Sequence, residues 1–458
     1  MRLPLVDRAD RVEREHTPAP VEGPAAADDD LVRVGDLLLV ADALERAERR
    51  AVVGEDLVAL GGGEEAELDR APDGDLGRRT TLRVPLTSVA VQSPHSEKLS
   101  FDQGGAFMRE TRRDVEQYLS RRRTRTSGAL QLYAKTAVAF ALTLAAWLGL
   151  VVAQPGLGLG LVCLAGLVLG SIITAFCVQH DANHGAYFRT RRANHLMGWT
   201  ADALLGFSSY TWRVKHNVAH HTYTNVEGYD DDIDQTPFLR LAPTQEPKPW
   251  YRLQWLYVWP LYSLMVLRWQ TGGDLAALVR GRIGHSAVRA PRRWDVLGLV
   301  GGKVVFVGWA LVAPLLVYPW WLVLAGYAGF MMAVSLIAAT TFQLAHSVEG
   351  ADTATPDEVA SASRPWAVHQ VETTVNFCPR NPVLTWLLGG LNFQIEHHLF
   401  PRVQHTHYAH IAAIVQRNCA RHGIRYTSQP SLRAALRAHV RHLRGMGRLG
   451  VPVEIEMG

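Results

Sequence analysis

Two long segments without charged residues constrain the fold of this 458-residue chain more than any other feature. Residues 136–179 and residues 304–345 contain no Asp, Glu, Lys or Arg. One membrane-spanning helix needs about 20 apolar residues, so each segment can hold two spans joined by a tight turn. We therefore predict an all-α membrane protein whose four transmembrane helices form two hairpins, with a cytoplasmic helical domain. The predicted spans are residues 133–153, 157–179, 296–317 and 321–344.

The turns of the hairpins and the charges around them predict the orientation. Gln154-Pro-Gly156 is a natural turn because proline and glycine interrupt helices, and Tyr318-Pro-Trp-Trp321 provides an aromatic turn. Both turns lack charge, whereas basic clusters at residues 121–125, 189–192 and 289–293 flank the outer ends of the hairpins. Because basic loops remain on the cytoplasmic side, we expect the active site and both termini in the cytoplasm, with the spans in a bacterial plasma membrane.

The remaining segments differ in composition. Residues 1–98 are rich in Ala, Arg, Asp, Glu and Gly, which is typical of a disordered or loosely structured extension. Residues 99–130 fit an amphipathic segment before the membrane, residues 131–425 the membrane domain, and residues 426–458 a basic cytoplasmic tail. Residues 250–269 are aromatic-rich, but only 15 uncharged residues separate the arginines within this segment. We therefore predict an interfacial segment there and not a fifth span.

Histidines gather in three clusters, or boxes, which are the first box at residues 180–184, the second at residues 216–221 and the third at residues 394–398. Eight of them are candidate metal ligands: His180, His184, His216, His220, His221, His346, His397 and His398. In a helix His216 and His220 share one face, and His221, rotated by about 100°, faces a second metal on the flank. His346 ends the fourth span as His180 ends the second. Eight imidazoles are too many for one ion and suit two.

Composition excludes other kinds of site. The four cysteines show no paired spacing, so no disulfide framework or cysteine-rich zinc motif is available. The formal net charge of +4 is too small to indicate nucleic-acid binding. The carboxylate pattern of soluble di-iron bundles, Glu with Glu-x-x-His, is not evident either.

Two strings resemble the integral-membrane fatty acid desaturase superfamily, and specifically its front-end type. They are Gly389–Pro401, which reads GGLNFQIEHHLFP, and Trp212–Asn225, which reads WRVKHNVAHHTYTN. The resemblance covers residues 105–425. It implies a fatty acyl desaturase that binds two iron ions and uses oxygen and two electrons to introduce a double bond into an acyl-CoA or acyl-lipid substrate.

The resemblance also bears on the electron donor. Many front-end members carry a fused cytochrome b5 domain, but its His-Pro-Gly-Gly motif is not visible in this sequence. A separate ferredoxin or flavoprotein reductase is therefore expected. The chemistry agrees with a metal centre, because a mid-chain methylene has no acidic proton or leaving group for acid–base or nucleophilic attack, and the protein must position a strong oxidant.

Polar residues beside the boxes are candidates for orienting the ligands or positioning the substrate. They are Asp181, Trp212, Asn225, Gln394 and Glu396, with Glu349 as a weaker candidate. The acidic run Asp230–Asp234 is expected to be a loop or helix start and not a cation site. His369, His405, His407 and His410 fall outside the box spacing and are not expected to be ligands. The others are expected in loops or at the surface: His195, His285, His422, His439 and His442.

Three other functions remain open from the residues. A di-iron membrane hydroxylase of lipids or alkanes shares the first hydrogen abstraction, although the string Gly389–Pro401 favours desaturation. A zinc-dependent membrane hydrolase needs only about three protein ligands and a water, fewer than the eight histidines here. A transporter is least compatible, because neither hairpin has an ionisable residue in its middle.

Overall fold

The computed structural model describes residues 99–448, except 103–104, 122–124, 284–285, 289 and 362–363. The predicted extension at residues 1–98 lies outside the described residues. The chain is mostly helical. Its helices are α2 (Ala106–Arg121), α3 (Arg125–Val151), α4 (Leu157–Ile173), η1 (Thr174–Gln179), α5 (His180–Asn183), α6 (Arg191–Leu205), α7 (Ser209–Trp212), η2 (Arg213–His220), α8 (His221–Tyr223), η3 (Pro249–Leu253), α9 (Gln254–Tyr262), α10 (Met265–Arg268), η4 (Trp269–Gly273), α11 (Asp274–Arg280), α12 (Arg293–Val307), η5 (Gly308–Val312), α13 (Ala313–Leu315), α14 (Trp320–His346), α15 (Pro356–Ser361), α16 (Trp366–Glu372), α17 (Pro382–Leu387), α18 (Gln394–Leu399), η6 (His405–His407), α19 (Tyr408–Arg421) and α20 (Leu432–Arg448).

Four continuous helical stretches are long and apolar enough to cross a membrane. They are Leu130–Val151, Leu157–Asn183, Arg293–Leu315 and Trp320–His346. The predicted number of spans is confirmed for the described residues, and the boundaries differ by a few residues. The second span extends beyond residue 179, because the π-helical turn η1 continues α4 into α5, so that His180 and Asp181 belong to the same helical stretch.

The surface of these stretches is apolar on the side that faces away from the protein. Leu144 is 57% exposed, Leu161 57% and Val304 65%. Contiguous apolar surface of this kind is stable only when a membrane or another apolar partner covers it. The opposite sides pack together: α3 contacts α4, α4 contacts α14, and α12 contacts α6.

Residues 250–269 form no fifth span within the described chain. The short helices η3, α9 and α10 divide this segment. It is absent from the four stretches that are suited to a membrane. The described residues therefore contain no fifth helix suited to a membrane, and the interfacial position of this segment stays a prediction.

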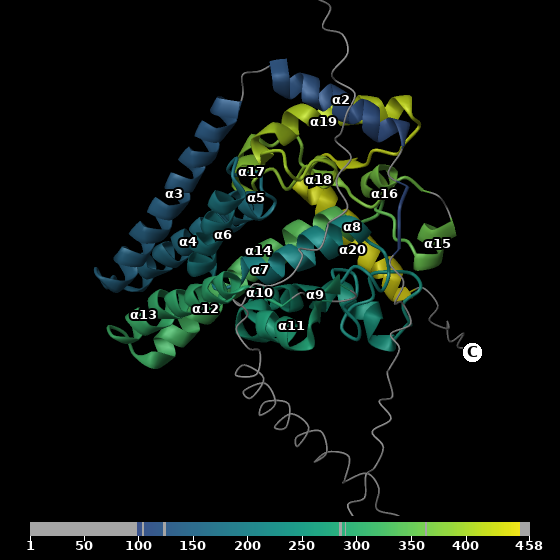
Figure 1. Cartoon of the computed structure of the whole chain (residues 1–458). Helices are drawn as coiled ribbons and strands as arrows, with labels where there is room; N and C mark the ends of the chain where they lie inside the picture. Colours follow the sequence, from purple (N-terminus) through teal and green to yellow (C-terminus); the bar gives the residue numbers. More distant parts are fainter. Residues whose placement is uncertain are drawn as a thin grey trace, which may run out of the picture.

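Figure 1 shows α3, α4, α12 and α13 extending to one side, with α2, α16, α18, α19 and α20 on the other. The short strands β3 (Asn376–Phe377) and β4 (Ser428–Gln429) form a parallel pair that joins the segment after α16 to the one before α20. A separate antiparallel pair is formed by β1 (Arg282–Ile283) and β2 (Ser286–Ala287).

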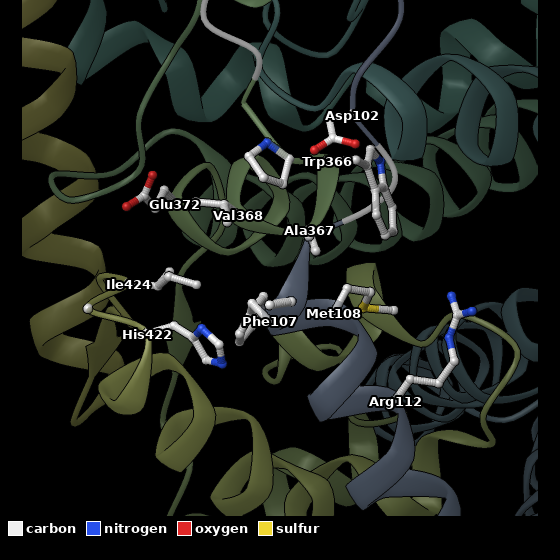
Figure 2. Close-up of a pocket in the computed structure, with 14 residues that line it drawn as sticks. Asp102, Phe107, Met108, Arg112, Trp366, Ala367, Val368, Glu372, His422 and Ile424 are labelled. Atoms are coloured by element: carbon white, nitrogen blue, oxygen red, sulfur yellow. The ribbon is translucent and has the colours of Figure 1, made fainter.

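The amphipathic helix predicted before the membrane is present as α2. Its Phe107 and Val115 are buried in one cluster with Ile411 and Val415 of α19. Figure 2 shows the hollow between α2, α16 and the end of α19, with Phe107 and Met108 beside Trp366 and His422. None of the eight clustered histidines lines this hollow, which therefore does not open onto them.

Candidate metal centre

Four separate parts of the chain bring the eight histidines together. α5 begins at His180 and is followed by its C-cap His184, η2 and α8 carry the second box, α14 ends at His346, and α18 carries the third box. In Figure 1 α5, α8 and α18 lie near one another in the middle of the molecule. Seven of the eight residues are buried, and His216 is half-buried. Their nitrogen atoms form three groups that fit an ion: His180, His184, His216 and His397; His220, His346 and His398; and His221, His397 and His398.

The distances between ring nitrogens fit metal ligation. His221 Nε2 lies 2.9 Å from His397 Nε2 and 3.2 Å from His216 Nε2. Two imidazole nitrogens that bind one ion at about 2.1 Å and at a right angle are about 3 Å apart. A hydrogen bond between neutral rings could explain one of these two contacts but not both. His221 Nε2 takes part in both contacts, and in a neutral ring this nitrogen is either a single donor or a single acceptor.

Unpaired buried nitrogens provide a second test of fit. His180 Nδ1 and Nε2, His184 Nε2, His346 Nδ1 and His398 Nε2 are buried without a hydrogen-bond partner. Leaving so many polar atoms unpaired in one place is costly unless something else binds them. The all-imidazole donor set suits iron, copper or zinc. The residues therefore fit the metal centre that the sequence predicted.

The second box departs from the prediction in one respect. His216 and His220 share a face as expected, with rings stacked at 5.3 Å. They nevertheless belong to different groups, because His220 turns towards His346 and His398 while His216 turns towards His180 and His184. His221 contacts the third box between them. The segment is a π-helix, whose turn is wider than that of an α-helix, so α-helical spacing does not describe it.

In three of the histidines the Nδ1 atom, on the ring edge away from the candidate ligand nitrogen Nε2, contacts a polar side chain. His220 Nδ1 lies 2.9 Å from Asp230 Oδ2, His398 Nδ1 lies 2.7 Å from Gln370 Oε1, and His397 Nδ1 lies 3.2 Å from the Tyr408 hydroxyl. Such contacts fix the ring orientation and leave Nε2 free to bind an ion. Sequence reasoning missed all three partners. Only for Asp230 was a signal available, in the acidic run ten residues after His220.

Burial favours the neutral, metal-binding form of five of the eight histidines. Desolvation, followed by the charges of neighbouring histidines, lowers the pKa of His184, His216, His221, His397 and His398 well below the ordinary value. These rings are neutral near pH 7 and have a lone pair available. His220 differs: burial alone lowers its pKa, but the Asp230 carboxylate raises it above the ordinary value.

Asp181 connects the first box to the first span. Its Oδ2 lies 2.8 Å from His405 Nδ1, and its Oδ1 lies 3.7 Å from His180 Nδ1. His405 Nε2 in turn lies 2.8 Å from Lys135 Nζ of α3. All three side chains are buried, so Asp181 is next to a ligand candidate as predicted, and His405 has a neighbour on each ring nitrogen.

The structure also places three other predicted positioning residues, Trp212, Asn225 and Gln394, relative to the histidines. The Trp212 ring packs on His216, with centroids 4.3 Å apart. Within the described residues no hydrogen bond joins the Asn225 side chain to an imidazole: the residue has a positive φ of 55°, and its Nδ2 donates to the carbonyl oxygens of His346, Asp352 and Thr373. Gln394 is buried close to His346.

Within the described residues, neither Glu396 nor Glu349 forms a hydrogen bond with a candidate ligand. Glu396 is fully buried and accepts from Asn376 Nδ2 and the Tyr426 hydroxyl. Glu349 is half-exposed and pairs with Arg441, which makes the prediction for it wrong. The prediction of surface positions for His439 and His442 is also wrong, since both lie on the buried face of α20, where they contact the carbonyl oxygens of Ser347 and Leu241. His285 lies outside the described residues.

Comparison with known proteins decides the family. The fatty acid desaturase model matches residues 156–430, which include all eight histidines. The chain belongs to the fatty acid desaturase family. It is 33% identical over 352 residues to an sn-1 linoleoyl-lipid 6-desaturase from Arthrospira platensis, which covers 77% of this chain and 95% of the relative. An sn-1 linoleoyl-lipid 6-desaturase from Synechocystis sp. is 32% identical over 355 residues, covering 77% and 99%.

A further relative supports the front-end type. An acyl-lipid (8-3)-desaturase from Physcomitrium patens is 37% identical over 274 residues, which are 59% of this chain and 57% of the relative. This desaturase is thus an integral membrane oxidoreductase of lipid metabolism. The predicted family, its front-end type and the reaction are confirmed.

Proposed function

We propose that this desaturase introduces a double bond near the carboxyl end of a fatty acyl chain esterified to a membrane lipid, with two iron ions bound by the eight clustered histidines. Two relatives that align over nearly their whole length are named linoleoyl-lipid 6-desaturases, which supports an acyl-lipid substrate over acyl-CoA and the 6 position as the first to test. The observation that carries the metal centre is the convergence of eight buried or half-buried imidazoles, many with unpaired nitrogens.

The ligands divide into two sides. His180, His184 and His216 are available to one ion, and His220, His346 and His398 to the other. His221 and His397 lie between the two sides. When bound, iron supplies the oxidising power that removes hydrogen from an unactivated methylene in the presence of oxygen and two electrons. The residues hold the rings: Asp230, Gln370 and Tyr408 contact the Nδ1 atoms, and Trp212 covers the first side.

The product identifies the reaction. We expect lipids from a host that expresses the desaturase to contain an acyl chain with a new double bond at carbon 6, detected by gas chromatography–mass spectrometry. A His397→Ala variant should give no such product, because His397 belongs to two of the three ligand groups. A hydroxylated acyl chain in place of the alkene would support the membrane hydroxylase. Modification of the acyl-CoA pool without the lipid pool would contradict the lipid substrate.

We further propose that the four spans form two hairpins, with both termini, the histidines and a separate electron-transfer protein on the cytoplasmic side. The contact between α3 and α4, the uncharged turn at residues 154–156 and the basic flanks support this arrangement. Domain limits remain as proposed from the sequence, with the membrane domain at residues 131–425.

Labelling of introduced cysteines tests the orientation. A Gly156→Cys variant and a Pro319→Cys variant should each react with a membrane-impermeant maleimide from the outside of intact cells. Gly156 suits a replacement, because no atom lies within 4 Å of an added Cβ. Arg433→Cys in α20, which is exposed, serves as the cytoplasmic control and should react only after the cells are opened. Reaction of both turns from the cytoplasmic side would contradict the topology.

A further inference from the structure

A second hollow opens directly onto two candidate metal ligands. It has a volume of about 640 Å³, and His184 and His221 are among the residues that line it. Around the two histidines stand Arg189, Arg191, Arg213 and Arg402. We call this feature the arginine-lined hollow. It joins the protein surface to the metal centre without passing through the membrane-facing side chains of the spans.

The charged residues that line the hollow are all positive. Its lining contains four arginines and no aspartate or glutamate. Arg213 is engaged, because it pairs with Asp295 at 3.5 Å and donates to Asn183 Oδ1. Arg189, Arg191 and Arg402 are exposed, and no ion pair is formed by any of them within the described part of the chain. Three uncompensated guanidinium groups therefore surround the opening.

The lining does not suit an acyl chain. Apart from histidines, arginines, asparagines and a glycine, it contains only Ala182 and Pro401. Methylene groups gain little from such a wall, because the hydrophobic effect requires apolar surface to be removed from water. Guanidinium groups instead bind carboxylates in a planar, bidentate manner. The side chains thus favour a ligand with exposed carboxylates.

The desaturation reaction needs a partner that delivers electrons. Conversion of –CH₂–CH₂– to –CH=CH– with O₂ balances as two waters formed, which requires two further electrons and two protons per turnover. The electrons must reach the metal ligands from outside the chain. We propose that the arginine-lined hollow is the docking site for an acidic one-electron carrier protein, whose carboxylates pair with Arg189, Arg191 and Arg402. Two reduced carrier molecules dock in turn during each turnover, and each is oxidised by one electron. This inference rests on the proposed function, because that function supplies the need for a separate donor.

Steady-state kinetics with a reduced plant-type ferredoxin test the docking site. The triple variant Arg189→Gln, Arg191→Gln and Arg402→Gln should raise the KM for ferredoxin at least about tenfold, because complementary charge raises association rates by one to three orders of magnitude. The dependence of the rate on ionic strength should also become flatter. The KM for the lipid substrate should stay the same. Bound iron and membrane insertion are measured first, to establish that the variant folds.

The helix α20 offers a matched control. Arg433, Arg437 and Arg448 are likewise exposed, and their replacement by glutamine removes the same charge elsewhere on the surface. This variant should keep the KM for ferredoxin of the unmodified protein. Equal effects of the two triple variants, or an unchanged KM in the first, would overturn the docking site. A changed lipid KM alone would assign the hollow to an anionic lipid headgroup and would equally overturn it.

The unmodified protein provides a test that does not depend on any variant. Its rate with ferredoxin should fall as the salt concentration rises, because screening weakens steering between opposite charges. A rate independent of salt would overturn an electrostatic docking site. Absence of desaturated lipid from the unmodified protein with ferredoxin or with a chemical reductant would instead contradict the proposed function itself, so the two failures are distinguishable.

Discussion

A His346→Ala variant is expected to lose desaturation entirely and to bind less iron, while its insertion into the membrane remains normal. His346 lies outside the three boxes, at the end of α14, yet its ring centroid is 4.6 Å from that of His220 and 5.0 Å from that of His398. Only these three histidines form the second group. Removing one leaves two protein nitrogens on that side, fewer than a stable transition-metal site requires. Iron analysis of the purified protein and lipid analysis of the host give the two readouts.

The control for this variant should be an exposed histidine. His410 of α19 is exposed and stacks on Tyr118 at 6.0 Å, so His410→Ala should retain iron and activity. The sequence indicates His369 as a control too, but His369 is fully buried and its Nε2 lies 2.8 Å from the Thr224 carbonyl oxygen. Its replacement would disturb the segment that carries the second box. Two bound irons and normal turnover in His346→Ala would remove His346 from the metal site.

Asp230→Ala is expected to lower iron affinity and activity by about 10–100-fold, the usual effect of losing a carboxylate behind a metal-binding histidine. Asp230 Oδ2 accepts from the Asn225 backbone N–H at 2.9 Å and lies 2.9 Å from His220 Nδ1. Alanine would therefore leave His220 Nδ1 with only the more distant Asp232 Oδ2, at 3.5 Å, and would leave the buried Asn225 N–H unpaired. Iron binding measured by competition with a chelator reports the first effect directly.

The acidic run supplies its own control for this position. Asp234 is exposed and accepts a hydrogen bond from the Thr236 hydroxyl, away from the histidines, so Asp234→Ala should bind iron as the unmodified protein does. Asp230→Asn keeps an acceptor for both neighbours and should recover part of the affinity. If Asp230→Ala bound iron normally, Asp230 would have only a structural role.

The predictions that succeeded came from patterns among residues close together in the sequence. An uncharged run of more than 40 residues, as between Lys135 and His180, has few alternatives to a pair of spans. The histidine boxes were evident for the same reason, since residues one to four positions apart reveal their common face. The front-end family followed from the third box and was confirmed by the relatives.

Contacts between distant residues could not be predicted from one sequence. Gln370 and Tyr408 resemble any other polar residue until α16 and α19 pack beside α18. His439 and His442 were misassigned because α20 alternates arginines with small residues, and its buried face consists largely of alanine, histidine and glycine with a single leucine. The arginines and the small apolar residues nevertheless fall on opposite sides of the helix, so its helical periodicity was an available signal for the burial of these two histidines.

The contact between Lys135 and His405 has a consequence for the order of assembly. Lys135 belongs to the first span and is 4% exposed, but its hydrogen-bond partner follows 270 residues later in the chain. A lysine within a span is costly to bury before it has a partner. All four spans are synthesised before residue 405, so the first span through Lys135 and the second through Asp181 complete these buried contacts only after the segment that follows α18 has been made. His405 therefore joins the ends of two spans that are already in the membrane.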